Sequence, residues 1–274
     1  MSDLSDDHYL QDLDNAHINT RDFEAGLADL SRGLHGGALD RANLWSQIHK
    51  LVMGQLSGPI TQPSDQALIC RYLSATKFLW FVRQFDVYFG SARAFEDKAD
   101  CGLPADYNNC VKSFLMGRKV NPIAWDDYSE RFRSGWLVSS WTELTEQHDD
   151  HLLWQVYAGG PSGVGITIRY EDLKDVLTRE STQRQLAGFT SGKVSYGSPV
   201  KIPPFYKRRI FRNDKEVRFA YRSDLLASDS LSIASLKDKI GLRFSPDASQ
   251  YHIDAVMETW RKWGGSDRYQ KAGD

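Results

Sequence analysis

The sequence predicts an α+β protein: a mixed, mostly antiparallel sheet core flanked by helices, with an N-terminal helical hairpin and a C-terminal helix. Short segments rich in β-branched and aromatic residues alternate with helical segments through the central half of the chain. Before and after that half, apolar residues recur at helical spacing. The 274 residues are enough for one large domain with an added subdomain.

Residues 1–62 are expected to form a helical extension. Apolar residues between Asp22 and Leu30 predict a first helix, and Gly residues follow it. A second helix is predicted from Asn43, where apolar residues share one face until a Gly-Pro pair ends the pattern. The two helices are expected to form a hairpin that packs on the rest of the chain.

Residues 63–265 are expected to form the α+β core domain. The predicted strands lie at residues 67–72, 86–89, 135–141, 163–168, 192–196 and 216–221. The predicted helices lie at residues 77–82, 110–118, near 125, 152–157 and 172–176. The helix at 152–157 is expected to bury Leu152, Leu153, Val156 and Tyr157, and the strand at 216–221 is the last one predicted.

The end of the chain predicts a helix followed by a disordered tail. Ser245 before Pro246 is a typical helix start. The expected buried stripe of this helix is Ile253, Val256, Met257, Trp260 and Trp263. Residues 266–274 are expected to be disordered.

Composition restricts the classes of function. A net charge of −2 argues against a general nucleic-acid binder, which would carry a basic excess. No apolar run approaches the ~20 residues that span a bilayer, so no membrane partner is expected. The acidic N-terminus lacks the apolar segment of a secretory signal, and the 3 cysteines fit no metal spacing. The chain is therefore expected to be cytoplasmic.

Two polar segments near residue 210 are candidates for chemistry. The run Lys207-Arg208-Arg209 could grip phosphates, and it could equally be a solvated loop. Strand alternation puts the side chains of Glu216 and Arg218 on one face. They form either a structural ion pair or a catalytic carboxylate held by its neighbour.

Two further segments carry candidate ligands. Arg71 and Tyr72 stand at the end of a predicted strand, where a rigid element would hold binding side chains. A surface ion pair and a half-buried core tyrosine explain them as well. His148 and His151 offer two metal ligands without a third, and charges at a helix start explain that segment equally.

The order of several motifs resembles a bacterial family known as domain of unknown function 2971. The shared motifs, spread over residues 68–264, include Arg71-Tyr72-Leu73-Ser74, Ser139-Ser140-Trp141-Thr142-Glu143, Leu153-Trp154 with Tyr157, Gly163-Val164-Gly165-Ile166, Tyr206-Lys207, Glu216-Val217-Arg218 and Leu242-Arg243-Phe244-Ser245-Pro246. The turn Phe95-Glu96-Asp97 departs from the family's usual wording. The family name states no activity.

The order of strands and polar residues is also similar, at the level of the fold, to ADP-ribosyltransferases. This resemblance implies that Arg71 holds NAD, that Ser139 or Ser140 braces the site, and that Glu216 is the catalytic carboxylate. Asp214-x-Glu216 has the spacing of the family's paired acids, with a shorter first acid, so the resemblance does not specify the acceptor.

The resemblance implies that NAD is the substrate and that no metal is needed. In this hypothesis Arg71 and the basic run with Lys207 grip the pyrophosphate. The nucleotide-binding set is completed by Tyr72, Ser140, Trp154, Tyr157 and Arg218. A protein or nucleic acid would be the acceptor, and the enzyme would act as a bacterial toxin or phage-defence effector.

Two alternatives stay open. A non-catalytic module that binds a nucleotide or a protein explains the aromatic residues and the basic run without chemistry. A nuclease would use Glu96, Asp97, Asp100 and Glu216 to bind a divalent cation.

Overall fold

The chain folds into two compact units. The computed structural model describes residues 21–33, 41–55, 58–97, 100–102, 104–118, 120, 123–145, 151–197, 202–223 and 225–272. The first unit, here called the helical unit, comprises residues 1–61, 92–136 and 194–213. The second, the sheet unit, comprises residues 62–91, 137–193 and 214–274.

The helical unit is built from four longer helices, α2 (Arg21–Gly33), α3 (Arg41–Gln55), α5 (Ala105–Gly117) and α6 (Ile123–Ser134). Their apolar faces share one core, which includes Phe23, Ile48, Val111 and Trp125. The two predicted N-terminal helices are therefore present. They are not a separate extension, because α5 and α6 supply half of the core that buries them. This unit also holds a short parallel pair, β6 (Ser195–Tyr196) and β7 (Tyr206–Lys207).

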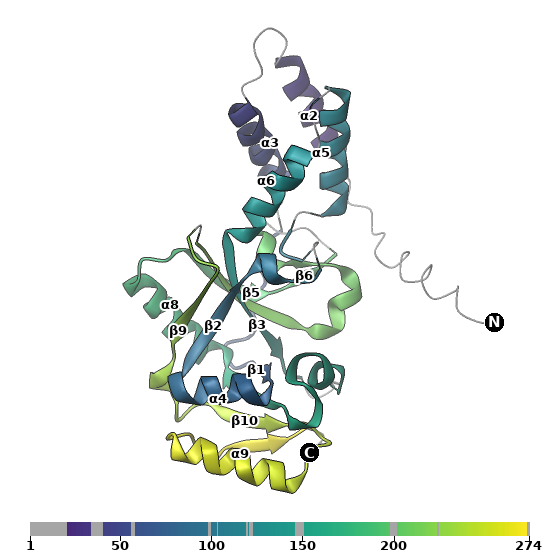
Figure 1. Ribbon diagram of the computed structural model, residues 1–274. Helices are drawn as coiled ribbons and strands as arrows, with labels where there is room; N and C mark the ends of the chain where they lie inside the picture. Colours follow the sequence, from purple (N-terminus) through teal and green to yellow (C-terminus); the bar gives the residue numbers. More distant parts are fainter. Residues whose placement is uncertain are drawn as a thin grey trace, which may run out of the picture. The chain divides into compact units, whose positions relative to one another are not determined.

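The sheet unit contains one large mixed sheet, as the sequence predicts (Figure 1). Its strands are β1 (Leu68–Leu73), β2 (Asp86–Ser91), β3 (Trp136–Glu143), β4 (Val164–Arg169), β5 (Ala187–Lys193), β8 (Glu216–Arg222), β9 (Ser228–Ser232), β10 (Gly241–Phe244) and β11 (Tyr269–Lys271). The order is β11-β10-β4-β1-β3-β2-β9, and β8 pairs with both β3 and β5. The pairs with printed register are antiparallel except that between β10 and β11, which is parallel.

The two faces of this sheet differ in chemistry. Because side chains alternate along a strand, the register sorts them into two sets. The core face carries Ile69, Leu73, Trp141, Ile166, Ile168, Val217, Phe219, Tyr221, Leu242 and Phe244, which belong to one apolar cluster. The opposite face, here called the polar face, carries Tyr72, Ser140, Thr142, Thr167, Glu216, Arg218 and Arg243.

Three helices cover the core face: α4 (Ala75–Gln84), α8 (Tyr170–Gln183) and α9 (Gln250–Lys262). Ser74 begins α4 because its hydroxyl accepts a hydrogen bond from the backbone N–H of Lys77. Trp260 of α9 is fully buried, with its ring 5.5 Å from that of Phe85 and stacked 6.4 Å from that of Phe81. These aromatic contacts join α9 to α4 over the sheet.

The last third of the chain differs most from the prediction. The strand at 216–221 is not the last one, because β9, β10 and β11 follow it. These strands have three to five residues, too few for a clear alternation of apolar and polar residues. The C-terminal helix begins at Gln250, where Ser249 caps it, and not at Ser245. In its predicted stripe, Trp263 is 42% exposed.

Residues 266–272 are ordered in the structure, where the sequence predicts disorder. The indole N–H of Trp260 donates to the carbonyl of Ser266 at 2.8 Å, and β11 then pairs with β10. Ala272 is buried against Cys70, Tyr72 and Trp154. Backbone hydrogen bonds and one small side chain hold this segment, so its polar sequence gives no sign of them.

None of the helices that the structure describes is long and apolar enough to cross a membrane.

Deleting residues 266–274 is expected to lower the free energy of unfolding by about 2–4 kcal/mol, because several backbone and indole hydrogen bonds are lost together. Urea unfolding followed by tryptophan fluorescence measures the change. Tyr251→Ser, at a side chain 84% exposed on α9, is the control and is expected to change stability by less than about 0.5 kcal/mol. An unfolding curve of the truncated chain that matches wild type would contradict the structural role of β11.

Candidate functional site

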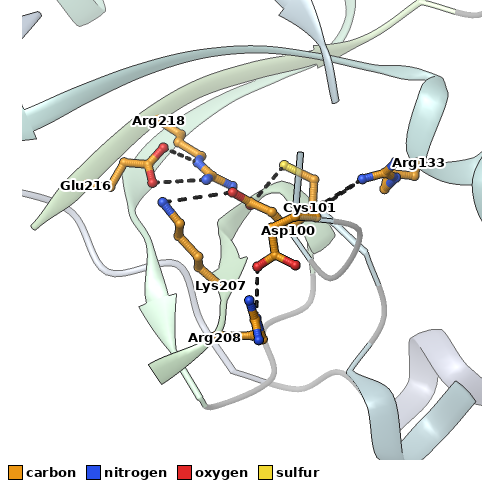
Figure 2. A network of polar contacts seen from close by, with 8 residues as sticks. Asp100, Cys101, Arg133, Lys207, Arg208, Glu216 and Arg218 are labelled. Carbon is orange, nitrogen blue, oxygen red and sulfur yellow. Dashed lines mark hydrogen bonds and ion pairs between the residues drawn. The ribbon is translucent and has the colours of Figure 1, made fainter. Parts of the chain in front are cut away.

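Glu216 and Arg218 form a buried ion pair on the polar face of β8. The guanidinium Nε of Arg218 donates to one carboxylate oxygen at 2.6 Å, and Nη2 donates to the other at 3.0 Å (Figure 2). The two residues are 6% and 1% exposed. The sequence prediction that they share a strand face is confirmed, because Val217 and Phe219 pack in the apolar core on the other side.

The pair shares its sheet face with two predicted binding residues. β8 and β1 flank β3 on opposite sides, since the N–H of Glu143 donates to Lys215 and that of Leu144 donates to Leu68. Tyr72 of β1 is 7% exposed, and Ser140 of β3 is half-buried. Three adjacent strands thus bring the carboxylate, a hydroxyl and a phenol to one face.

A single π-helical turn contributes to this face. α7 (His151–Leu153) runs directly into the π-helix Trp154–Ala158, which Gly159 ends in the left-handed conformation at φ 77°. Trp154 is fully buried, and its ring meets that of Tyr72 edge-on at 4.8 Å. π-helical turns occur frequently at functional sites. This turn therefore marks the polar face as a candidate site.

The prediction for the buried side of this turn is wrong in three of four residues. Leu152, Val156 and Tyr157 are 69%, 62% and 48% exposed. The buried side chains are Leu153, Trp154 and Ala158. The prediction assumed the period of an α-helix, whereas the wider π turn shifts which residues face inward. Tyr157 is consequently a surface residue beside Trp154.

Arg243 of β10 belongs to the same face and was not predicted as a site residue. It is 9% exposed, and its Nη1 donates to the hydroxyl of Tyr72 at 3.4 Å. The sequence signal was present but short: the run Leu242-Arg243-Phe244 alternates apolar, basic, apolar. The structure confirms that alternation, because Leu242 and Phe244 lie in the apolar core.

Arg71 lies on the core face, opposite Glu216, at the junction of three strands. Its Nη1 donates to the carbonyl of Tyr88 on β2 at 2.9 Å and to the hydroxyl of Ser139 on β3 at 2.7 Å. The indole N–H of Trp141 donates to the same hydroxyl at 3.1 Å. Burial lowers the pKa of the Arg71 guanidinium to about 10, which leaves it cationic at neutral pH. Its contacts are those of a residue that joins strands.

The predicted basic run lies in the helical unit, where its members are paired. The Nζ of Lys207 is 3.9 Å from the carboxylate of Asp100 and 4.7 Å from the ring centre of Phe211. The Nε of Arg208 donates to Asp97 at 2.9 Å. Lys207 and Asp100 both appear in Figure 2. Lys207 is 6% exposed, so its surroundings are those of a packed ion pair more than of an open phosphate grip.

Within the described part of the chain, no group of three or more His, Cys, Asp or Glu side chains could hold a metal ion. His148 lies outside the described residues. Asp97 and Asp100 have cationic partners, as described above. The structure therefore offers no donor set with which to argue for the nuclease alternative.

The structure brings Tyr72, Ser140, Trp154, Glu216 and Arg218 to one side of one sheet. Of the other predicted site residues, Tyr157 lies at the surface of the adjoining turn. Arg71 lies on the opposite side of the sheet, and Lys207 belongs to the other unit. An open hollow of about 490 Å³ elsewhere in the sheet unit is lined by Thr178, Ser181, Thr182, Gln185, Leu186, Gly188 and Phe189, and no polar-face residue lines it.

Comparisons of the chain with family models, with curated proteins and with solved structures found no match. The resemblances drawn from the motifs therefore stay predictions.

Arg71→Met is expected to lower the free energy of unfolding by about 2–4 kcal/mol, because it leaves buried acceptors on two strands without their donor. Arg83→Met, at an exposed arginine near the end of α4, is the matched control and is expected to change stability by less than about 0.5 kcal/mol. Urea unfolding compares the two variants. Equal stability of both variants would return Arg71 to the set of ligand-binding candidates.

Proposed function

We propose that the chain is an enzyme that cleaves NAD at the nicotinamide–ribose bond, of the ADP-ribosyltransferase or NAD glycohydrolase type, with Glu216 as the catalytic carboxylate. The observation that carries this proposal is the polar face itself. Adjacent strands present one buried carboxylate together with two hydroxyl-bearing side chains, Tyr72 and Ser140, beside a buried tryptophan.

The energetics of the face support a functional reading. Burying a charged pair is costly, and well-packed apolar residues in its place are often neutral or stabilising. The core face of the same strands shows that apolar residues suit this sheet. A buried Glu–Arg pair on the other face is therefore better explained by a task than by stability alone.

The proposed reaction needs a carboxylate at the position where positive charge develops. Heterolysis of the N-glycosidic bond leaves the bonding pair on the nicotinamide nitrogen, so nicotinamide departs neutral and the ribose carbon becomes oxocarbenium-like. A carboxylate stabilises such a centre, as in glycoside cleavage. Water or an acceptor nucleophile then bonds to that carbon and loses a proton, for which a carboxylate can serve as base.

Arg218 would position the carboxylate. Its two hydrogen bonds fix both oxygens of Glu216, which limits the rotation of the carboxylate on the strand. Ser140 and Tyr72 would bind the ribose and the ring of the substrate, with Trp154 packed behind Tyr72. Arg71 has no contact with substrate in this proposal and acts as a positioning residue through Ser139.

Glu216→Gln is expected to reduce NAD cleavage by about 10²–10⁴-fold, the range for loss of a positioned carboxylate. Release of nicotinamide, measured by chromatography, follows the reaction. Glu143→Gln removes a carboxylate on the core face of β3 that pairs with Lys193, and is the matched control with near wild-type turnover expected.

The variant also leaves the charge of Arg218 buried without its carboxylate, which costs on the order of 3–5 kcal/mol. Turnover is therefore compared at a temperature at which circular dichroism shows both variants folded. Ser140→Ala, which keeps the ion pair, is expected to lower turnover as well. Wild-type turnover in folded Glu216→Gln would refute the catalytic role, and NAD binding without cleavage by wild type would favour the non-catalytic binding module.

A further inference from the structure

We propose that Arg243, in a row with Gly165 and Tyr72 beneath Trp154, binds the diphosphate of the dinucleotide. This inference rests on the proposed function and assigns the anion-binding part of the same face, which the sequence assigned to Arg71 and the basic run.

The three residues form a straight row across three strands. Arg243 of β10 is opposite Gly165 of β4, and Gly165 is opposite Tyr72 of β1. Residues in such a row point to the same side of a sheet and lie about 5 Å apart. Arg243 reaches across the glycine to Tyr72, and this is the contact at 3.4 Å.

Glycine at position 165 makes this row possible. A Cβ added there would lie 2.8 Å from Sγ of Cys70, 3.2 Å from Cβ of Arg243 and 3.3 Å from Cη2 of Trp154. A side chain would therefore push the tryptophan and the arginine away from the strand. The glycine lets both approach the middle of the row, where their donor groups come close to the hydroxyl of Tyr72.

The groups in this row are predominantly donors. The guanidinium supplies a full positive charge, and the Tyr72 hydroxyl that accepts from it retains its own O–H to donate. The indole N–H of Trp154 is buried and has no hydrogen-bond partner in the structure. A buried donor without an acceptor costs free energy that a ligand acceptor would recover. A ligand with negative charge and several acceptor oxygens fits this set.

The position of the row favours a diphosphate within a dinucleotide. The guanidinium contacts Tyr72 on β1, and β3 separates β1 from β8, the strand of Glu216. Two strand spacings are about 10 Å, a separation that a ribose joined to a diphosphate can span. An anion held at the row would thus leave the ribose carbon near Glu216.

The row reaches the surface beside the π-helical turn. Tyr72 and Arg243 retain 7% and 9% exposure, and Val156 and Tyr157 of the turn are largely exposed next to buried Trp154. The diphosphate would bind from this side, and the turn would order around it. The wide π turn is a segment whose hydrogen bonding is readily rearranged.

Binding of ADP-ribose, adenosine and inorganic pyrophosphate to the full chain tests this inference by calorimetry. ADP-ribose contains the diphosphate but lacks the bond that the enzyme would cleave, so its affinity does not depend on catalysis. Arg243→Lys keeps the charge and loses the fork of donors, and Trp154→Phe keeps a ring and loses the N–H. Arg169→Lys, at an exposed pair with Asp172 on the same sheet, is the matched control.

Arg243→Lys is expected to weaken ADP-ribose binding about 10-fold and Trp154→Phe about 3- to 10-fold, the usual effect of losing a hydrogen bond to a charged ligand. Adenosine affinity and the control are expected to stay within about 2-fold of wild type. Pyrophosphate is expected to compete with ADP-ribose in wild type.

Unchanged ADP-ribose affinity in folded Arg243→Lys would overturn the inference and leave the catalytic role of Glu216 untouched. An equal loss of adenosine and ADP-ribose affinity would overturn it too, because that pattern indicates a general disturbance. If wild type binds neither ADP-ribose nor pyrophosphate, the inference fails, and NAD turnover alone then decides the proposed function.

Discussion

The guanidinium of Arg71 joins three strands that would otherwise separate. β3 pairs with β1 near its C-terminal end and with β2 near its N-terminal end, so the two partners meet along one strand. At that meeting point Arg71 donates both to a backbone carbonyl of β2 and to the hydroxyl of Ser139. A cation with several donors in a fixed plane is suited to such a junction. The positions of Ser140 and of the whole polar face depend on it.

The separation of the two faces follows from that sheet. On the core face, α4, α8 and α9 bury a continuous apolar layer, and this layer supplies the hydrophobic stabilisation. The polar face can then carry a buried ion pair, a second buried arginine and an unpaired indole N–H. Groups that would destabilise an isolated sheet are tolerated because the other face stabilises it.

The sequence predicted the parts of the fold that have long or regular patterns. The strands around Tyr72, Trp141 and Val217 and the helix at Ala75–Gln84 match the structure closely. It failed for β10 and β11, which have four and three residues. For the site, alternation placed Glu216 and Arg218 together, but no local pattern tells which face of β1 Arg71 occupies. That depends on which neighbours pair with the strand, and pairing is not local information.

The same reasoning separates two roles for arginine on this sheet. Arg71 points into the apolar core, where its acceptors are a backbone carbonyl and a serine fixed by Trp141, and it joins strands. Arg243 points to the polar face, where its contact with Tyr72 is a long hydrogen bond to a neutral hydroxyl. A neutral hydroxyl does not neutralise a buried guanidinium, whereas an anionic ligand does. The arginine that suits a phosphate is therefore the one that the short strand β10 concealed.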